Sequence, residues 1–177
     1  IIHAWRDMYM RISAANPFVQ YIQLFENKGS AMGCSNPHPH GQIWALDYVP
    51  SEPMKVMKSM YDFSADPANE HAPGPRHPHG RPHLLLAYAH MELHAPGRPR
   101  IVTLNDDFVA LVPFWAVWPF EIMVLPYKRF LGSLQDLTDA EIASLAHILG
   151  EVTCRYDNLF RTSFPYSMGI HQKPVSH

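Results

Sequence analysis

The sequence predicts an α+β fold in which helices flank antiparallel strands, arranged as parts of two related domains. The 177-residue chain is 47% apolar and 17% charged, so it has enough apolar residues for a core and is not disordered as a whole. Short β-forming runs alternate with helical patterns along the chain. Each half places strand–loop–strand material beside a helix, although the two halves share no repeated residues.

The N-terminal part is predicted to contain a helix, a strand, a loop and a second strand, at residues 2–14, 18–25, 26–37 and 40–48. The helix is predicted from Trp5, Met8, Tyr9 and Ile12, which recur at spacings of three and four residues. Asn16-Pro17 is expected to end it. Both strands follow from alternating β-forming residues, and the glycines between them indicate a loop.

The middle of the chain is predicted to form a helix, a proline-rich loop and a second helix, at residues 52–63, 64–82 and 83–94. In the first helix, Met54, Met57 and Tyr61 share one side. The loop carries five prolines, which favour extended surface segments over helix or sheet. In the second helix, the apolar side expected to face inward is formed by Leu84, Leu85, Tyr88 and Met91.

The C-terminal part is predicted to contain three strands, a long helix and a final extended segment, at residues 100–104, 107–112, 120–125, 138–160 and 163–171. Asn105-Asp106 indicates a tight turn between the first two strands. Thr138 and Glu141 form a capping-box pattern at the start of the helix. Its apolar stripe consists of Ile142, Leu145, Leu149, Val152, Tyr156 and Leu159. Residues 108–125 are apolar enough to suggest a membrane span, but Pro113 and Pro119 would break such a helix.

The charge and the cysteine content limit the classes of function that the chain can have. With 14 basic and 16 acidic residues the net charge is −2, so no global basic field exists to hold nucleic acid or an anionic membrane. Cys34 and Cys154 form neither a CxxC pair nor a disulfide framework, which favours reduced thiols in a cytoplasmic protein. No charged region followed by an apolar region marks a signal peptide at the start.

The segment from Gly33 to Gln42, GCSNPHPHGQ, is the sharpest local signal. On an extended backbone His38, His40 and Gln42 share a face, and Gly41 allows a bulky group to approach. A neutral imidazole can attack phosphorus when a bond to its other nitrogen, usually from a carbonyl, holds the ring. The preceding loop offers backbone N–H groups for phosphate oxygens, and a glutamine amide can bond an oxyanion. The pattern outlines a phosphoryl- or nucleotidyl-transfer site; a pair of satisfied loop histidines fits the bare spacing equally well.

The same four residues, HPHG, occur again at His77–Gly80. This copy lies inside the proline-rich loop and no β-forming run follows it, so His77 and His79 are expected to be solvated loop residues. Together with His71 and His83 they could bind a metal adventitiously, but they lack the regular ligand spacing of a zinc site.

Longer motifs make the chain resemble the galactose-1-phosphate uridylyltransferase family. The resemblance covers nearly the whole chain apart from residues 64–82, and it is carried by Phe25–Gly29, Ala31–Ala45, Asn105–Pro126, Asp136–Thr138, Arg155–Phe160 and Ser163–Gly169. It implies a histidine-triad-like fold. It also implies a ping-pong reaction in which UDP-glucose gives its uridylyl group to a histidine, and galactose 1-phosphate then accepts it.

The resemblance also assigns residues. The family's nucleophile, the second histidine of HPHGQ, falls on His40, and its phosphate-contacting glutamine falls on Gln42. The family's nucleotide-binding positions fall on Asn27, Gly33, Cys34 and Ser35.

Two metal sites are implied as well. His38 matches a structural zinc ligand, and His171 matches a ligand of a second site that holds iron or zinc. The acidic ligand of that second site falls on Val56, with Glu52 as the nearest acid.

The chain is therefore expected to be a central segment of such an enzyme, without the family's N-terminal and C-terminal segments. Residues 1–50 would be the end of the N-terminal uridylyltransferase domain, 51–82 a connecting helix and Pro/His-rich loop, and 83–177 part of the C-terminal domain. The full-length form would be a cytoplasmic homodimer. Two alternatives stay open: a histidine-triad-type nucleotide hydrolase or phosphorylase, and a catalytically silent truncated paralogue.

Overall fold

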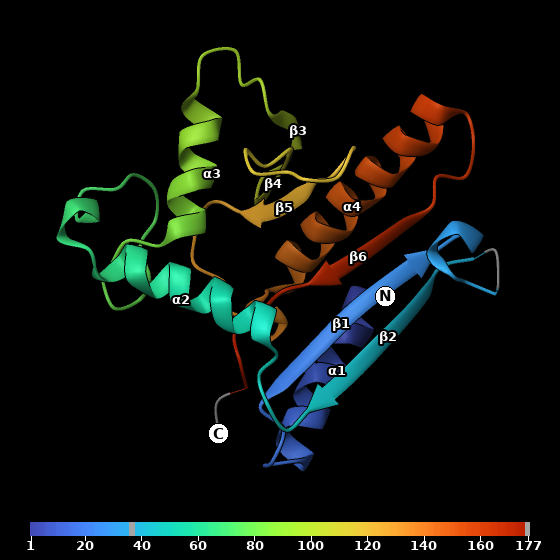
Figure 1. The fold of residues 1–177 in the computed structure, drawn as a ribbon, viewed down its shortest axis with the longest axis horizontal. Coiled ribbons are helices and arrows are strands. Elements are labelled where there is room, and N and C mark those ends of the chain that lie inside the picture. Colours follow the sequence, from blue (N-terminus) through green and yellow to red (C-terminus); the bar gives the residue numbers. More distant parts are fainter. Residues whose placement is uncertain (36–37, 176–177) are drawn as a thin grey trace. The chain divides into compact units, whose positions relative to one another are not determined.

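The computed structural model describes residues 1–35 and 38–175, and it divides the chain into two compact units (Figure 1). The first unit consists of residues 1–54, 132–137 and 153–177, and the second of residues 55–131 and 138–152. Each unit contains a three-stranded antiparallel sheet together with helices. The α+β fold class is therefore confirmed.

The sheet of the first unit is built from β1 (Tyr21–Lys28), β2 (His40–Leu46) and β6 (Tyr166–Ile170), in the order β2-β1-β6. Strand β1 pairs with β2 from Tyr21 opposite Leu46 to Asn27 opposite His40. It pairs with β6 from Leu24 opposite Ile170 to Lys28 opposite Tyr166. The central strand thus joins a neighbour in sequence to a segment about 140 residues away.

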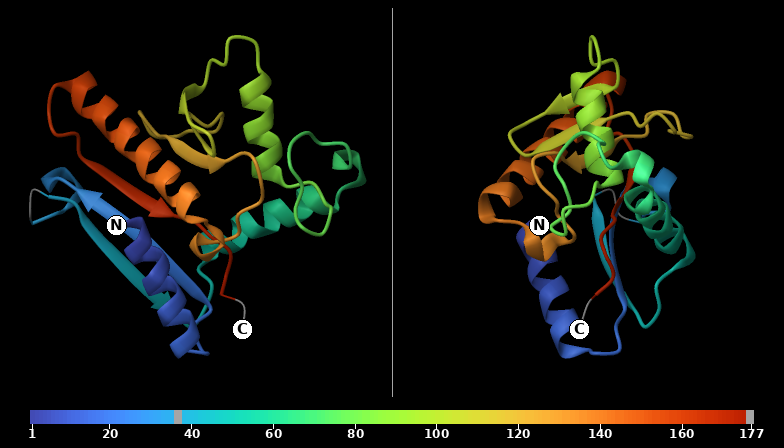
Figure 2. Two further views of the ribbon diagram at one scale, coloured as in Figure 1. Left: turned by 180° about the vertical axis from the view of Figure 1, so that it is seen from behind. Right: turned by 90° about the vertical axis from the view of Figure 1, so that its left-hand side faces the viewer.

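One face of this sheet is covered by α1 (Ile2–Ala15), as the two opposite views in Figures 1 and 2 show. Ile22 and Leu24 of β1 are buried, as are Trp5 and Tyr9 of the helix. A Cβ atom at Gly41 would lie 3.4 Å from Nε1 of Trp5. The close approach that Gly41 allows is therefore made by Trp5, on the face of the sheet away from His40.

The second half of α4 (Asp139–Phe160) also belongs to the first unit. Asp157 accepts hydrogen bonds from Lys28 Nζ, at 3.3 Å, and from the backbone N–H of Phe164, at 2.7 Å. The ring of Phe164 stacks on those of Tyr156 and Phe160, at centroid distances of 4.7 and 4.8 Å. These contacts tie the end of the helix to the segment that leads into β6.

The sheet of the second unit contains β3 (Ile101–Leu104), β4 (Phe108–Leu111) and β5 (Met123–Pro126), in that order. Its core joins these strands to α3 (Leu84–His94) and consists of Tyr88, Ala89, Leu93, Val109, Leu111 and Leu125. Asn105 forms the predicted turn between β3 and β4. Its backbone N–H donates to the carbonyl of Phe108, and its Oδ1 accepts from the N–H of Phe108 at 2.9 Å.

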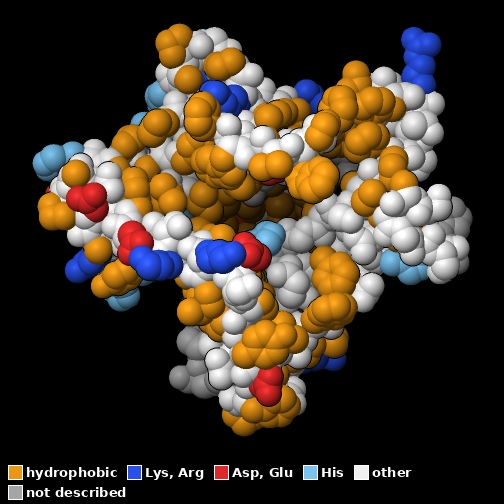
Figure 3. Space-filling view, viewed as in Figure 1, with side chains coloured by type: hydrophobic (Ala, Val, Ile, Leu, Met, Phe, Trp, Pro, Cys, Tyr) orange, Lys and Arg blue, Asp and Glu red, His pale blue; other side chains and the backbone are white. Residues whose placement is uncertain are grey.

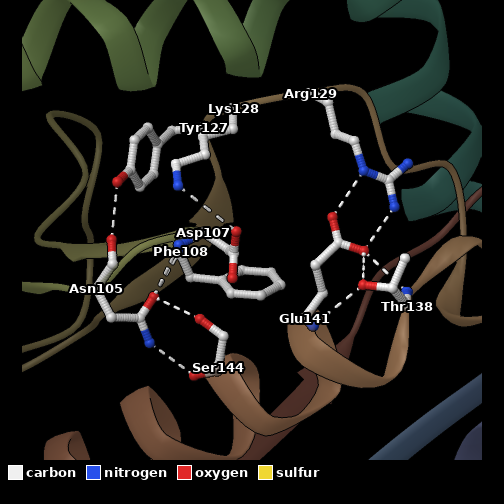
Figure 4. A network of polar contacts seen from close by, with 9 residues as sticks. All are labelled: Asn105, Asp107, Phe108, Tyr127, Lys128, Arg129, Thr138, Glu141 and Ser144. Carbon is white, nitrogen blue, oxygen red and sulfur yellow. Dashed lines mark hydrogen bonds and ion pairs between the residues drawn. The ribbon is translucent and has the colours of Figure 1, made fainter.

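The N-terminus of α4 has the predicted capping box (Figure 4). The N–H of Thr138 donates to Glu141 Oε2 at 2.8 Å, and the N–H of Glu141 donates to Thr138 Oγ1 at 3.2 Å. Arg129 adds a bidentate pair that the sequence did not predict, with Nε and Nη2 at 2.7 and 2.6 Å from the two oxygens of Glu141. Arg129 and the capping bonds together lower the pKa of Glu141 from 4.5 to about 2.

The remaining elements are α2 (Ser51–Ala65) and three short 3₁₀ turns, η1 (Ser30–Met32), η2 (Pro67–Asn69) and η3 (Leu134–Asp136). Between β4 and β5, large hydrophobic side chains are exposed at Val112, Phe114, Trp115, Val117, Trp118 and Phe120. The space-filling view in Figure 3 shows hydrophobic side chains at the molecular surface. None of the helices in the described part of the chain is both long and apolar enough to cross a membrane.

Every predicted strand differs from the observed strand at one or both ends, and for two of them the structure shows why. Strand β1 covers residues 21–28 rather than 18–25, because residues 16–19 form a turn in which the N–H of Val19 donates to the carbonyl of Asn16. Strand β5 covers 123–126 rather than 120–125, because Phe120 has a φ of 64° and cannot continue a strand.

Several predicted inward positions are wrong. Met91 is 58% exposed and Leu159 is 65% exposed. On α3, four apolar residues outside the predicted stripe are buried instead, namely Leu86, Ala87, Ala89 and Leu93. In α2 no residue is buried, so its shared apolar side is not part of a core.

Candidate active site

His40 is the first residue of β2, and its ring is held by the backbone two residues before it. Nδ1 of His40 lies 2.8 Å from the carbonyl oxygen of His38. A carbonyl can only accept, so Nδ1 carries a proton and donates, and in the neutral form of the ring the lone pair is on Nε2. The rings of His38 and His40 stack at 4.8 Å and 13°. The predicted orienting carbonyl is thus present, and it comes from the motif itself.

Asn27 lies beside His40 across the sheet. It is opposite His40 on one side and opposite Ser167 of β6 on the other, so the three side chains form a row on one face. Ser167 Oγ donates to Asn27 Oδ1 at 2.7 Å and lies 3.4 Å from Met32 Sδ. Ser167 was not identified from the sequence as a site residue, since only the pairing of β1 with β6 places it here.

Gln42 lies two residues after His40 on β2, so the two side chains share a face as predicted. Its Oε1 accepts a hydrogen bond of 3.1 Å from Nε1 of Trp44. The Trp44 ring in turn meets the edge of Phe25 at a centroid distance of 5.4 Å. Trp44 was also missed, although its spacing of two residues from Gln42 would have placed it on this face.

The glycine-containing loop before the motif is built around η1. Gly33 ends the turn with a φ of 78°, which favours glycine. The N–H groups of Met32, Gly33 and Cys34 donate to carbonyls of Gly29 and Ser30, so the loop itself uses them. The amides that the sequence suggested as phosphate donors are therefore bonded within the loop in this structure. Ser35 is exposed and Cys34 is half-buried, whereas Asn36 and Pro37 of the motif lie outside the described residues.

His171 directly follows β6, and its Nε2 lies 3.5 Å from the position of a Cβ atom at Gly169. Partial burial lowers the pKa of its imidazole. Val56 is exposed on α2.

The residues present do not by themselves complete either implied metal site. Across residues 1–35 and 38–175, no three His, Cys, Asp or Glu side chains come close enough to hold a metal ion. Structural zinc sites use four protein ligands, so ligation by His38 or His171 would require donors beyond those described.

The second HPHG copy has a different hydrogen-bond pattern. The N–H of His79 donates to Nδ1 of His77 at 3.2 Å, so in this copy the ring of the first histidine accepts a hydrogen bond. In the first copy, by contrast, the carbonyl of His38 holds the ring of His40. His79 is exposed, as expected, but His77 is half-buried and packs on Phe130 at 4.4 Å. His83 packs on the same ring at 5.2 Å, and burial lowers its pKa. No strand begins at this copy.

Two family models match the chain. The model described as the N-terminal domain of galactose-1-phosphate uridyl transferase matches residues 1–50, and the C-terminal domain model matches residues 68–177.

Individual relatives agree with these matches. The galactose-1-phosphate uridylyltransferase of Kluyveromyces lactis is 47% identical over 99% of this chain, and that of Haemophilus influenzae is 42% identical over 99%. Among solved structures, a uridylyltransferase mutant superposes with a TM-score of 0.82 at 26% identity, covering 99% of this chain and 52% of that one.

The chain spans 44% and 45% of the lengths of the two relatives. It matches models of both domains, and the C-terminal model alone covers more than half of it. The chain belongs to the galactose-1-phosphate uridylyltransferase family.

Proposed function

We propose that this chain carries the uridylyl-transfer centre of a UDP-glucose–hexose-1-phosphate uridylyltransferase, with His40 as the nucleophile. The observation that carries the proposal is the 2.8 Å contact between His40 Nδ1 and the His38 carbonyl oxygen. That bond fixes the ring's orientation and leaves the lone pair on Nε2, which a nitrogen nucleophile requires. Family membership supplies the substrates, UDP-glucose and galactose 1-phosphate.

In the first half-reaction, Nε2 of His40 attacks the α-phosphorus of UDP-glucose. A phosphorus–nitrogen bond forms, the bond from phosphorus to the bridging oxygen breaks, and glucose 1-phosphate leaves with the electron pair. The ring becomes cationic while Nδ1 keeps its proton, and the His38 carbonyl stabilises that charge through the same hydrogen bond. In the second half-reaction, a phosphate oxygen of galactose 1-phosphate attacks the same phosphorus, and the phosphorus–nitrogen bond breaks.

Asn27 and Gln42 would supply amide donors to the oxygens of the transferred phosphate. Asn27 lies beside His40 across the sheet, and Gln42 lies beside it along the strand. Both are neutral, so they stabilise developing negative charge without pairing permanently with the phosphate. We also assign Gly33, Cys34 and Ser35 to the nucleotide side of the site, because they belong to the loop that leads to His38.

We further propose that residues 1–50 and 83–177 belong to two related domains joined by 51–82. The N-terminal family model ends at residue 50, and the C-terminal model begins at residue 68, within the proposed connecting segment. We also propose a cytoplasmic location and a homodimeric full-length form, as the resemblance to this family implies. A net charge of −2 supports neither nucleic acid nor membrane as a partner.

Zinc at His38, and iron or zinc at His171, would need ligands beyond the described residues. Elemental analysis of the purified chain should therefore find zinc well below one equivalent. One tightly held equivalent would refute this ligand assignment.

The direct test incubates the chain with UDP-glucose labelled at its α-phosphate. We expect label on the protein in an acid-labile, base-stable linkage, and its complete loss in His40→Ala. His79→Ala is the matched control, because His79 is the second histidine of the other HPHG copy and is exposed; it should label like the wild type.

Two outcomes would contradict the proposal. Release of UMP from UDP-glucose without galactose 1-phosphate, at the rate seen with it, would indicate a hydrolase. Absence of label at millimolar UDP-glucose would indicate a catalytically silent chain.

A further inference from the structure

The two amide side chains next to His40 share an arrangement. Each has its carbonyl oxygen bonded to a donor on the side away from His40: Trp44 for Gln42, and Ser167 for Asn27.

The Gln42 amide is held along the strand. His40, Gln42 and Trp44 follow one another at spacings of two residues on β2, so Gln42 lies between the other two on one face. The indole Nε1–H of Trp44 can only donate, so the atom that it meets at 3.1 Å must be the Gln42 oxygen. The oxygen is therefore engaged by Trp44, which leaves the NH₂ group for another partner on the face that Gln42 shares with His40.

The Asn27 amide is held across the strands. In the row from β2 to β6, Asn27 lies between His40 and Ser167. Ser167 Oγ donates to Asn27 Oδ1 at 2.7 Å, so this oxygen points toward β6. The Asn27 NH₂ group is thus left for a partner other than Ser167, in the row that Asn27 shares with His40.

We propose that Trp44 and Ser167 are positioning residues, which hold the Gln42 and Asn27 amides with their NH₂ groups toward the phosphate attacked by His40. This inference rests on the proposed function. An amide without a fixed partner can rotate and present its oxygen, which repels a phosphate oxygen. With both oxygens engaged, the two amides offer only donors, and they need no reorganisation during the reaction.

The experiment is a double-mutant cycle on the labelling rate from UDP-glucose. Trp44→Phe removes the indole N–H but keeps an aromatic ring beside Phe25, and Gln42→Leu removes the amide. We expect Trp44→Phe to slow labelling about 3- to 10-fold, the range for one lost hydrogen bond. In the Gln42→Leu background it should have no further effect, because Trp44 acts through Gln42.

Ser167 offers a rescue test. Ser167→Ala should slow labelling to a similar extent, and Ser167→Thr, which keeps the hydroxyl, should restore most of the rate. The matched control is Trp118→Phe, because Trp118 is 76% exposed in the loop between β4 and β5; it should leave the rate unchanged. Additive effects of Trp44→Phe and Gln42→Leu, or equal losses in Ser167→Ala and Ser167→Thr, would overturn the proposal.

A second readout does not depend on catalysis. Titration with inorganic phosphate, followed by the ring signals of His40 in NMR spectra, gives a dissociation constant for each variant. We expect the same non-additive pattern, with about 3- to 10-fold weaker binding in Trp44→Phe. If the wild type takes no label but the binding cycle is coupled, the proposed function fails and the positioning role stands. If phosphate binding is absent or the cycle is additive, the positioning role fails, whatever the labelling result.

Discussion

Glu141 is expected to make a large pH-dependent contribution to the stability of the second unit. Its carboxylate accepts a bidentate pair from Arg129 and closes the capping box with Thr138 (Figure 4). The lowering of its pKa from 4.5 to about 2 corresponds to about 3.4 kcal/mol, at 1.36 kcal/mol per pKa unit. The Arg129 side chain is 45% exposed, so solvent screens part of this energy. We expect a net contribution of about 2 kcal/mol.

The substitution that isolates the ion pair is Glu141→Gln, because glutamine can still close the capping box but carries no charge. The folded-state pKa lies below the unfolded value, so the charge contribution is complete above about pH 4.5 and is lost as the pH falls toward 2. We expect the variant to be about 2 kcal/mol less stable than the wild type at pH 7, and the difference to shrink close to zero near pH 2.

Urea denaturation followed by tryptophan fluorescence measures both differences. Asp62→Asn is the matched control, because Asp62 pairs with Lys58 on α2 where both side chains are more than half exposed. It should change stability by less than about 0.5 kcal/mol at either pH. A Glu141→Gln destabilisation of the same size at pH 7 and pH 2 would refute the reasoning, since it would come from packing rather than charge.

Substitutions at three further positions test single contacts, each by urea denaturation. Gly29→Ala should destabilise the first unit by about 1–3 kcal/mol, since the residue has a φ of 93° and the new Cβ would lie 2.9 Å from that of Pro165; an unchanged midpoint would contradict this. Tyr166→Phe removes the hydroxyl that donates to buried Glu26 at 2.5 Å, and should cost about 1–3 kcal/mol. An unchanged urea midpoint in Tyr166→Phe would argue against this contribution. Asn105→Ala should cost about 2 kcal/mol by opening the β3–β4 turn, whereas Asn105→Asp, which keeps the accepting oxygen, should recover part of it.

Local signals in the sequence were enough to predict the main elements. The capping residues Thr138 and Glu141 are three apart, and their bonds form as expected. The C-terminal end of β1 was predicted three residues too early. The residues Glu26–Lys28 are polar, and a pattern of hydrophobic residues does not identify polar residues as part of a strand. They belong to the strand because it is central, with Glu26 bonded to Tyr166 of β6 and Lys28 to Asp157 of α4.

In the candidate site, too, contacts between residues close in sequence could be predicted, whereas contacts between distant residues could not. The contact of His40 with the His38 carbonyl lies within three residues, so the motif could predict it. The position of Ser167 next to Asn27 depends on strand pairing across 140 residues, which no single-sequence pattern reports. The amides of the glycine loop were predicted as phosphate donors because composition does not show that a 3₁₀ turn uses them.

The pairing of β1 with β6 has a consequence for how the chain folds during synthesis. The ribosome releases β1 and β2 before β6, and the two can form a hairpin at once, but the third strand appears only after about 120 more residues. At about 5–20 residues per second this takes about 6–24 seconds. Throughout that interval one edge of β1 is unpaired and competes for strands of other nascent chains. We therefore expect a chaperone that shields strand edges to raise the yield of this chain more than it does for proteins whose sheets close locally.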